Sequence, residues 1–445
     1  TVFREEKFLS FNAEWMQTLG SSFSVRLDGM GQVLCLLTAL VYPLIFISTW
    51  QATYRKAFNF FGWMLLAQAG LMGVFVAMDA LLFYFFWELA LVPMYFLCSQ
   101  WGGEKRIRVT FKFFIYTFLG SILMLIGILY VQAHTANHSF SLEAFYGANI
   151  KASTESWLFW LFFIAFAIKM PVFPLHTWQP DTYEQSPTAT TMVLSGVMVK
   201  MGLLGLIRWL LPVLPSGSFQ WSDFIPPLAL AGLFYASLID IRQDDIKRLI
   251  AYSSIEHIGF MCAAVFSMNQ IGVQGVMFQM LSHGINIIGL WMLVEFIERR
   301  YGTRKLSELG GLAQKAPVMA ILFVVIALAN IALPLTNGFV GEFLMFNGLL
   351  QIKSQYYMWF TVMAGIGVIL SAVYTLNMIR KIFYGKTRDF AAPGGDLRWN
   401  ESLALGIIVV LVFWLGIYPQ PLLDITDQVT KDVLGFFETV QFTGK

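Results

Sequence analysis

The chain has 445 residues, of which 57% are hydrophobic, 16% aromatic and 13% charged, and its mean hydropathy is +0.66. Soluble proteins carry roughly 25% charged residues, so this chain has too little polar surface to cover a water-facing particle. Its three cysteines are far apart, which excludes a disulfide framework and a Cys-only iron–sulfur or zinc site. A net charge of +2 without a basic run gives no indication of nucleic-acid binding. The composition predicts a polytopic membrane protein.

Twelve segments are long and apolar enough to cross a bilayer, which takes about 20 residues as a helix. Their continuous apolar runs favour helices over barrel strands, which alternate over about ten residues. The predicted spans are residues 31–50, 57–77, 80–100, 110–132, 155–175, 187–211, 224–240, 249–267, 270–297, 317–351 (with a break), 358–380 and 401–418. Residues 421–441 are amphipathic and predict a helix in the membrane interface. We therefore expect an all-α polytopic fold.

Two of the predicted spans contain breaks of similar sequence. Pro171 and Pro174 interrupt the fifth span, and Pro334 and Gly338 interrupt the tenth. The breaks are five spans apart, an odd number, so the two segments would cross the membrane from opposite faces. This pattern is typical of inverted repeats whose broken helices place ion sites near the bilayer midplane. A pair of ordinary proline kinks remains the alternative.

Ionisable residues lie inside several predicted spans, where lipid disfavours them. A charged side chain at the centre of a spanning helix costs roughly 2.5–3.5 kcal/mol on insertion scales. Such groups must face one another or water inside the bundle, and lysine, histidine and carboxylate groups in contact can hold and transfer protons. The candidate proton-pathway residues are Glu88, Lys169, Lys200, His257, His283 and Glu342.

Other polar residues have an ordinary interpretation beside the functional one. Lys112, His176 and Glu256 are possible members of the same pathway. However, Lys112 is close enough to a span end to snorkel to the headgroups, and Glu256 could point into a local water pocket. The histidines of the eighth and ninth spans could simply hydrogen-bond to neighbouring helices. Asp79 and Asp240 fall at span ends and are expected to be solvated.

Loop charge predicts how the chain is oriented. When the loops are assigned alternately to two sides, one side receives 18 Lys and Arg residues and the other receives 8, while 3 lysines lie inside spans. Positive residues accumulate in cytoplasmic loops. The richer side is therefore predicted to be cytoplasmic, with both ends of the chain on the outer side.

Several long segments resemble the antiporter-like membrane subunits of respiratory complex I, the NADH–quinone oxidoreductase. They are FFWELALVPMYFL, FAIKMPVFPLHTWQPDTYEQSPTATTMVLSG, VKMGLLGLIRW, DDIKRLIAYSSIEHIGF, MLSHGI and NGFVGEFL, within a similarity that runs from about residue 28 to 425. The resemblance implies two inverted five-helix repeats, each with a discontinuous helix and a proton half-channel, at residues 57–211 and 212–384. Residues 1–56 would form an extramembrane start and the first span. Residues 385–445 would form the last span and the amphipathic interface helix.

The resemblance also implies roles for single residues. Glu88 matches a glutamate that pairs with a lysine of the broken helix, and Lys169 matches that lysine. Lys200 matches the central lysine of the proton path, from which the two histidines lead to Glu342. A glutamate at this last position, where sister subunits usually have lysine, indicates one branch of the family. Glu256 stands where the family usually has a small or uncharged residue, so no role is carried over to it.

By this resemblance the chain is a proton-translocating subunit of the bacterial inner membrane, driven by redox chemistry elsewhere. No cofactor or metal is expected here, and NADH, FMN, iron–sulfur clusters and quinone would belong to partner subunits. The expected partners are sister antiporter-like subunits on both sides, the long lateral helix of a neighbour, and the lipid bilayer. Family members begin with two further hydrophobic helices, so we expect a truncated chain holding twelve of fourteen spans.

Three other functions remain open at this stage. A subunit of a multi-subunit Na⁺/H⁺ antiporter and a membrane subunit of an ion-pumping hydrogenase share the same ancestry. A haem protein with His257 and His283 as axial ligands is disfavoured, because both histidines lie in motifs that the family resemblance explains.

Overall fold

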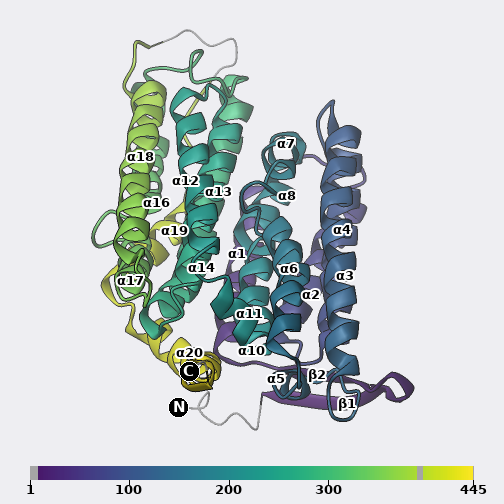
Figure 1. Ribbon diagram of the computed structural model, residues 1–445. Coiled ribbons are helices and arrows are strands. Elements are labelled where there is room, and N and C mark those ends of the chain that lie inside the picture. The colour runs from purple at the N-terminus through teal and green to yellow at the C-terminus, as the bar shows by residue number, and fades with distance from the viewer. Residues whose placement is uncertain (1–8, 388–393, 444–445) are drawn as a thin grey trace.

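The computed structural model of the chain describes residues 9–387 and 394–443, so the start of the predicted extramembrane segment lies outside it. Long helices run side by side, with a β-hairpin and short helices at one end of the bundle (Figure 1). Ten described helical segments are long and apolar enough to span a membrane. They are Gly29–Ser48 (α1), Ala57–Val76 (α2), Ala80–Trp101 (α3), Arg106–Ala133 (α4), Ala152–Lys169 (α6), Thr188–Val213 (α8 to α10), Ile225–Arg242 (α12), Gln270–Tyr301 (α14), Tyr357–Phe383 (α18) and Trp399–Ile417 (α19).

The other two of the twelve predicted spans have a different character. Helix α13 (Ile246–Val265) is long enough, but its charged and histidine residues make it more polar than the ten. At the tenth predicted span the chain forms two 14-residue helices, α16 (Pro317–Asn330) and α17 (Asn337–Leu350). A helix of that length measures about 21 Å, less than the hydrocarbon core of about 30 Å.

The fifth predicted span is also interrupted. Helix α6 ends at Lys169, and the chain turns through Pro171 and Pro174 before α7 (Trp178–Gln185) begins. Proline lacks the backbone N–H that a continuing helix would use, which explains why the helix stops here. Both sequence breaks therefore coincide with an end of helical structure.

The segment after α7 runs through the interior of the protein. It consists of α8 (Thr188–Val193), the π-helical turn η4 (Leu194–Met198), α9 (Lys200–Leu204), a second π-helical turn η5 (Gly205–Leu210) and α10 (Leu211–Val213). Every residue of this segment is buried, and α14 is almost as enclosed. π-Helical turns are rare and are frequent at functional sites.

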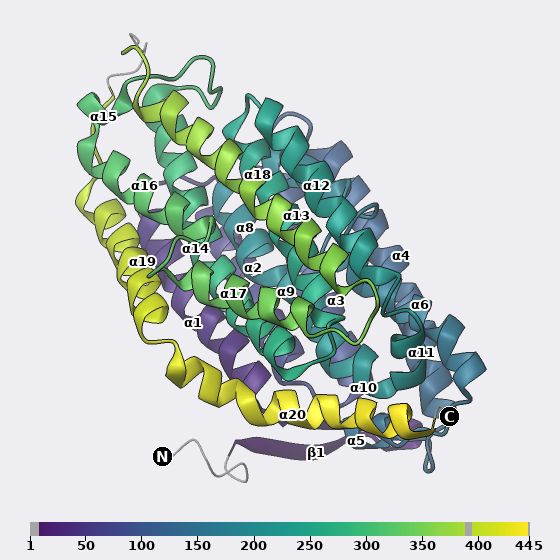
Figure 2. The ribbon, with the colours of Figure 1, turned by 60° about the vertical axis from the view of Figure 1, so that its left-hand side comes forward.

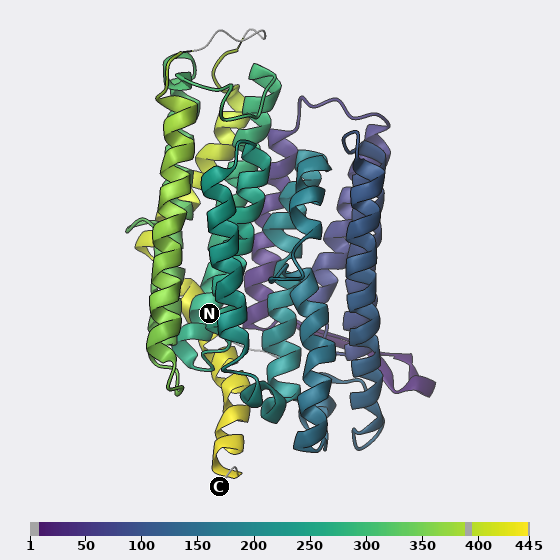
Figure 3. The ribbon, with the colours of Figure 1, turned by 45° about the horizontal axis from the view of Figure 1, so that its top comes forward.

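Helices α4, α18 and α19 form the outer surface and expose large apolar side chains, as lipid-facing helices do. Helix α1 lies in the middle, where it packs against α2 and α8 on one side and against α14 and α19 on the other. In Figure 3 this purple helix is visible between the green and the blue groups. The halves of the bundle thus meet around α1.

One end of the bundle is covered by elements that lie across it. An antiparallel hairpin, β1 (Ser10–Met16) and β2 (Ser21–Arg26), was not predicted from the sequence. Helix α20 (Gln420–Thr443) is present where an amphipathic helix was predicted, and it crosses the ends of α1, α14, α10 and α11 (Figure 2). The remaining short elements are η3 (Gln17–Leu19), α5 (Leu142–Tyr146), α11 (Pro215–Gln220) and α15 (Leu312–Lys315).

Candidate functional site

The centre of the candidate site is a contact between Lys200 and His283. Lys200 is the first residue of α9, two positions after the end of the π-helical turn η4, and it is fully buried. Its Nζ lies 2.9 Å from the Ser195 carbonyl oxygen and 2.9 Å from Nδ1 of His283 on α14. A protonated lysine can only donate, so His283 accepts through Nδ1 and carries its own proton on Nε2. Lysine and histidine therefore form one buried donor–acceptor contact between two helices.

A second contact continues from this pair. The ring of His257, on α13, has its centroid 5.4 Å from that of His283. His257 Nδ1 lies 3.5 Å from Oε1 of Glu342 on α17, and both side chains are buried. Lys200, His283, His257 and Glu342 thus lie in sequence across four helices, with His283 rather than His257 next to the lysine.

Asn330 is a member of this cluster that the sequence did not predict. It is the last residue of α16, and its Nδ2 lies 3.1 Å from His257 Nε2 and 3.2 Å from Ser253 Oγ. Because the amide nitrogen donates, His257 Nε2 accepts and the ring proton sits on Nδ1, facing Glu342. The available signal was a lone asparagine in the apolar run ahead of the second break, ALANIALPL.

Glu88 and Lys169 form a separate pair in the first half of the chain. Lys169 is the last residue of α6 and is buried, with its Nζ 5.2 Å from the centroid of the Trp87 ring. Glu88 follows Trp87 on α3, and its charge acts on Lys169. Lys169 Nζ and Glu88 Oε1 have no hydrogen-bond partner among the described residues. Nor does a hydrogen bond in this part of the chain join the pair to Lys200.

Lys112 reaches an ion cluster near one end of the bundle. Its Nζ donates to Oδ2 of Asp181 at 2.9 Å and to the Thr177 carbonyl at 2.7 Å, and Asp181 also accepts from Arg248. Burial opposes ionisation of Asp181, but the two cations outweigh it and hold the pKa of the carboxyl below its usual value. His176 is buried near this cluster, and its Nδ1 lacks a partner among the described side chains.

Two aspartates that were expected to be solvated are buried instead, so that prediction was wrong. Asp79 caps α3 and also accepts from the Ser22 amide of the hairpin, which covers it. Asp240 is 1% exposed because α13 and α18 pack over α12. Glu256 is buried too, and it accepts a hydrogen bond from the Tyr374 hydroxyl at 2.8 Å. The hairpin that covers Asp79 and the helix α18 that packs near Asp240 are both distant in sequence, which explains the error.

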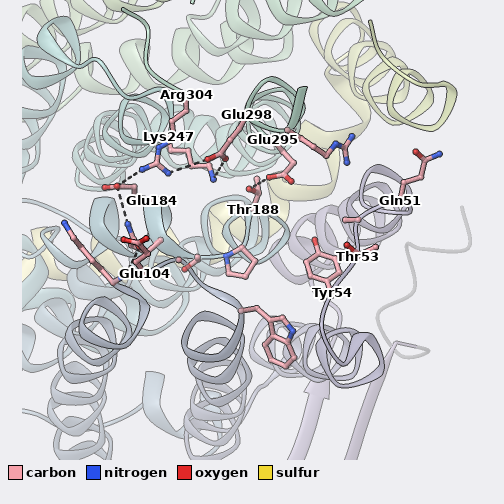
Figure 4. A pocket seen from close by; sticks show the side chains of 18 residues that line it. Gln51, Thr53, Tyr54, Glu104, Glu184, Thr188, Lys247, Glu295, Glu298 and Arg304 are labelled. Atoms are coloured by element: carbon pink, nitrogen blue, oxygen red, sulfur yellow. Dashed lines mark hydrogen bonds and ion pairs between the residues drawn. The ribbon is translucent and has the colours of Figure 1, made fainter. Parts of the chain in front are cut away.

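A polar hollow of about 730 Å³ opens at the end of the bundle where the ion cluster of Lys112, Asp181 and Arg248 lies (Figure 4). Lys247 pairs with Glu298 at 2.6 Å along its rim. Thr188, at the start of α8, donates to Glu295 of α14. Lys200 lies twelve residues after Thr188, on α9, and His283 lies twelve residues before Glu295, on α14. Twelve residues of α-helix correspond to about 18 Å.

Two polar side chains with atoms unpartnered among the described residues lie on these segments between the hollow and the Lys200–His283 contact. The side chains of Thr190 and Asn286 are buried there with oxygen atoms that have no partner in the described structure. Buried polar atoms of this kind are usually satisfied by water.

The described residues contain no cluster of three or more His, Cys, Asp or Glu side chains placed to hold a metal ion. His257 has both ring nitrogens engaged with Asn330 and Glu342, so neither is available as an axial ligand to a haem iron. The arrangement suits proton transfer between side chains.

Comparison with known proteins identifies the family. A family model described as NADH:quinone oxidoreductase/Mrp antiporter, TM, matches residues 77–371. NADH-quinone oxidoreductase subunit M of Rhodobacter capsulatus is 38% identical over 92% of this chain and 81% of its own length. The subunit M of Escherichia coli (strain K12) is 36% identical over 96% of this chain and 85% of its own.

Solved structures agree with this assignment. A chain of respiratory complex I from Thermus thermophilus with bound NADH has a TM-score of 0.89 and 29% identity, covering 96% of this chain and 89% of that one. A chain of the Mrp complex from Dietzia sp. has a TM-score of 0.86 at 20% identity, covering 98% and 89%, which shows a shared fold. The chain therefore belongs to the antiporter-like membrane subunits of bacterial respiratory complex I, as a subunit M of NADH-quinone oxidoreductase in the proton-translocating membrane arm.

Proposed function

We propose that Lys200, His283, His257 and Glu342 carry protons through the second half of this subunit. The observation that supports this most is the buried Lys200–His283 contact, because a proton can pass directly between two such nitrogen atoms. His257 continues the line toward Glu342, and Asn330 keeps its proton on the nitrogen that faces the carboxylate. In the first half, Glu88 and Lys169 set the local charge and so determine when Lys200 takes up a proton.

Protons reach Lys200 from the polar hollow in this proposal. The hollow is lined by residues of the loops at 51–56, 101–109, 241–248 and 298–316, all from the side that is richer in Lys and Arg. That bias supports a cytoplasmic position for the hollow. The hairpin, α20 and both ends of the chain would then lie on the outer side, with α20 in the interface.

The two interrupted helices support a pair of inverted repeats. Residues 57–211 contain α2 to η5, and residues 212–384 contain α11 to α18, with α10 across the boundary, so each half includes one interruption. Non-helical backbone at membrane depth is tolerated only where it is buried or lines a wet cavity. We propose that α6–α7 and α16–α17 are the discontinuous helices of two proton half-channels. Residues 1–56 and 385–445 flank the repeats.

Redox chemistry takes place in other subunits under this proposal. NADH, FMN, iron–sulfur clusters and quinone would be bound there, and energy would reach this subunit through its neighbours. The exposed apolar faces of α4, α18 and α19 are suited to lipid and to other membrane subunits. Sister antiporter-like subunits on both sides and the lateral helix of a neighbour are the proposed contacts.

The test uses inverted membrane vesicles that contain the whole complex with Glu88→Gln, and follows NADH oxidation and proton uptake together. We expect both rates to fall in parallel, because removing the charge beside Lys169 blocks a step that is coupled to electron transfer. Glu143→Gln is the matched control, since that glutamate is exposed and lies at the end of the bundle. Unchanged rates for Glu88→Gln contradict the proposal.

A Na⁺/H⁺ antiporter subunit is the second candidate, favoured by the fold shared with the Mrp complex chain. In that case NADH oxidation stays intact in Glu88→Gln vesicles while a Na⁺-dependent pH gradient disappears. A membrane subunit of an ion-pumping hydrogenase would respond to hydrogen in place of NADH. The same vesicles therefore separate all three functions.

A further inference from the structure

We propose that Asp240 and Glu256 form a second proton-holding site beside the Lys200–Glu342 line, in which two carboxylates share one proton. We call these two residues the carboxylate pair. Nothing in the family resemblance assigns this role, because Glu256 replaces a small or uncharged residue and Asp240 lies outside the matched motifs.

The pair is deeply buried between three helices. Asp240 lies in the last turn of α12 and Glu256 near the middle of α13, with exposed fractions of 1% and 2%. The two helices pack closely, and the charge of Glu256 acts on Asp240. Tyr374 of α18 donates to Glu256 Oε2, and Ser371 lies 3.3 Å from the same hydroxyl.

The surroundings of the Asp240 carboxylate indicate that it binds a proton. Both of its carboxylate oxygens are buried, and neither has a hydrogen-bond partner among the described residues. An ionised carboxylate in such a place costs several kcal/mol unless a cation or a proton compensates it. No ion pair joins Asp240 or Glu256 to a lysine or an arginine in the described part of the chain.

The groups that face the pair offer no other source of positive charge. They are Tyr374 of α18, Glu342 of α17 and His257 of α13. Only the histidine can become cationic, and its ring nitrogens are engaged with Glu342 and Asn330. While that ring is neutral, two buried carboxylates without a cation are not both ionised, so one proton remains on the pair.

Because the pair lies beside His257, its protonation state influences the protonation of that ring. Glu256 is next to His257 in sequence, and its charge acts on that ring. A singly protonated pair is negative and favours a proton on His257, whereas a doubly protonated pair is neutral and favours its release toward Glu342. This consequence rests on the proposed role of His257, but the shared proton itself does not.

The experiment treats membranes containing the whole complex with a hydrophobic carbodiimide, which reacts with protonated carboxyl groups, in potassium buffer across a pH series. Mass spectrometry of peptides measures the adduct on Asp240 and Glu256. We expect modification at neutral pH that declines as the pH rises.

Two substitutions should move the pH midpoint of Glu256 modification in opposite directions. Asp240→Asn removes a like charge and should lower the midpoint by about one pH unit or more. Tyr374→Phe removes a donor to the ionised form and should raise it. Asp244→Asn is the matched control, because it makes the same charge change four residues away at a loop carboxylate that binds Ser307, and it should leave the midpoint unchanged.

Three outcomes overturn the proposal. The absence of modification on both residues at pH values near 6 means that both are ionised. An unchanged midpoint in Asp240→Asn means that they do not share a proton, and Glu256→Gln, read out on Asp240, repeats that test if the first variant fails to assemble. Protection when Na⁺ replaces K⁺ means that the site holds a metal cation. Labelling needs no NADH, so its failure leaves the pumping proposal untouched.

Discussion

The ionisable groups of this subunit fall into two regions that differ in how completely the groups are paired. Around the hollow, Asp181 and Glu184 each accept from basic side chains, with Arg248 and Arg304 among the donors. In the interior, Lys200 has one carbonyl and one histidine as partners, and several neighbouring atoms have none in the described structure. Full pairing stabilises the charged form of a group, whereas a buried group with few partners gains less from being charged and can change its protonation state more readily. The comparison separates groups that maintain structure from groups that transfer protons.

The largest effect is expected from Lys200→Met, which tests the interior region directly. It removes the nitrogen that contacts His283, so proton uptake and NADH oxidation in vesicles should both fall more than tenfold while the complex still assembles. Lys431→Met is the control, because that lysine is exposed on α20 and pairs only with Asp427. Retention of half the wild-type pumping in Lys200→Met would remove Lys200 from the pathway.

Glu401→Gln tests whether burial alone, without regard to pairing, defines the groups that transfer protons. Glu401 is 1% exposed, yet it accepts from both Arg299 and Arg300. Removing one partner of a buried ion pair costs about 3–5 kcal/mol, so the thermal stability of the complex should drop clearly. The number of protons taken up per NADH in the complex that survives should stay the same. A changed ratio in a stable complex would contradict the distinction between the two regions.

Asn330→Leu sharpens the comparison within the interior. The leucine leaves His257 Nε2 without its donor, and an unsatisfied buried group of this kind costs about 1–3 kcal/mol. We expect a several-fold loss of proton uptake because the ring proton is no longer held toward Glu342. Ser253→Ala removes the other contact of the amide and should have little effect. Equal losses in both variants would mean that the amide only supports the local fold.

Asp181→Asn should give the smallest effect, since this carboxylate is about a third exposed. Its pKa lies below the ordinary value, so its ionised form adds stability above pH of about 3.9, and that stability is lost as the pH falls through the lower folded-state value. A solvent-screened pair of this type contributes about 0.2–1 kcal/mol. Thermal unfolding should show a small deficit at pH 7 that narrows in acid. A deficit that grows in acid has the wrong sign.

The sequence predicted those features that depend on neighbouring residues in one segment. Long apolar runs predicted the spanning helices, and the prolines after Lys169 predicted the end of α6. The burial of Asp79 depends on a hairpin more than 50 residues away, and that of Asp240 depends on helices that come later in the chain. Spacing along a helix does not reveal which other helix faces it. The place of Asn330 beside His257 was hidden for the same reason.

Helix α20 has a mechanical consequence. It crosses the ends of α10 and α11 and also those of α1 and α14, burying residues such as Leu422, Thr426, Thr430 and Val433 against them. Many secondary transporters work by rocking one half of the molecule against the other. Here such a movement would detach α20 from the helices of one half and expose its apolar face to water. Helix α20 contacts α11 and α14 of the second half, and its Phe436 packs against Tyr146 of the first half. We therefore expect the cycle to proceed through small shifts of side chains and water rather than through a large movement between the halves.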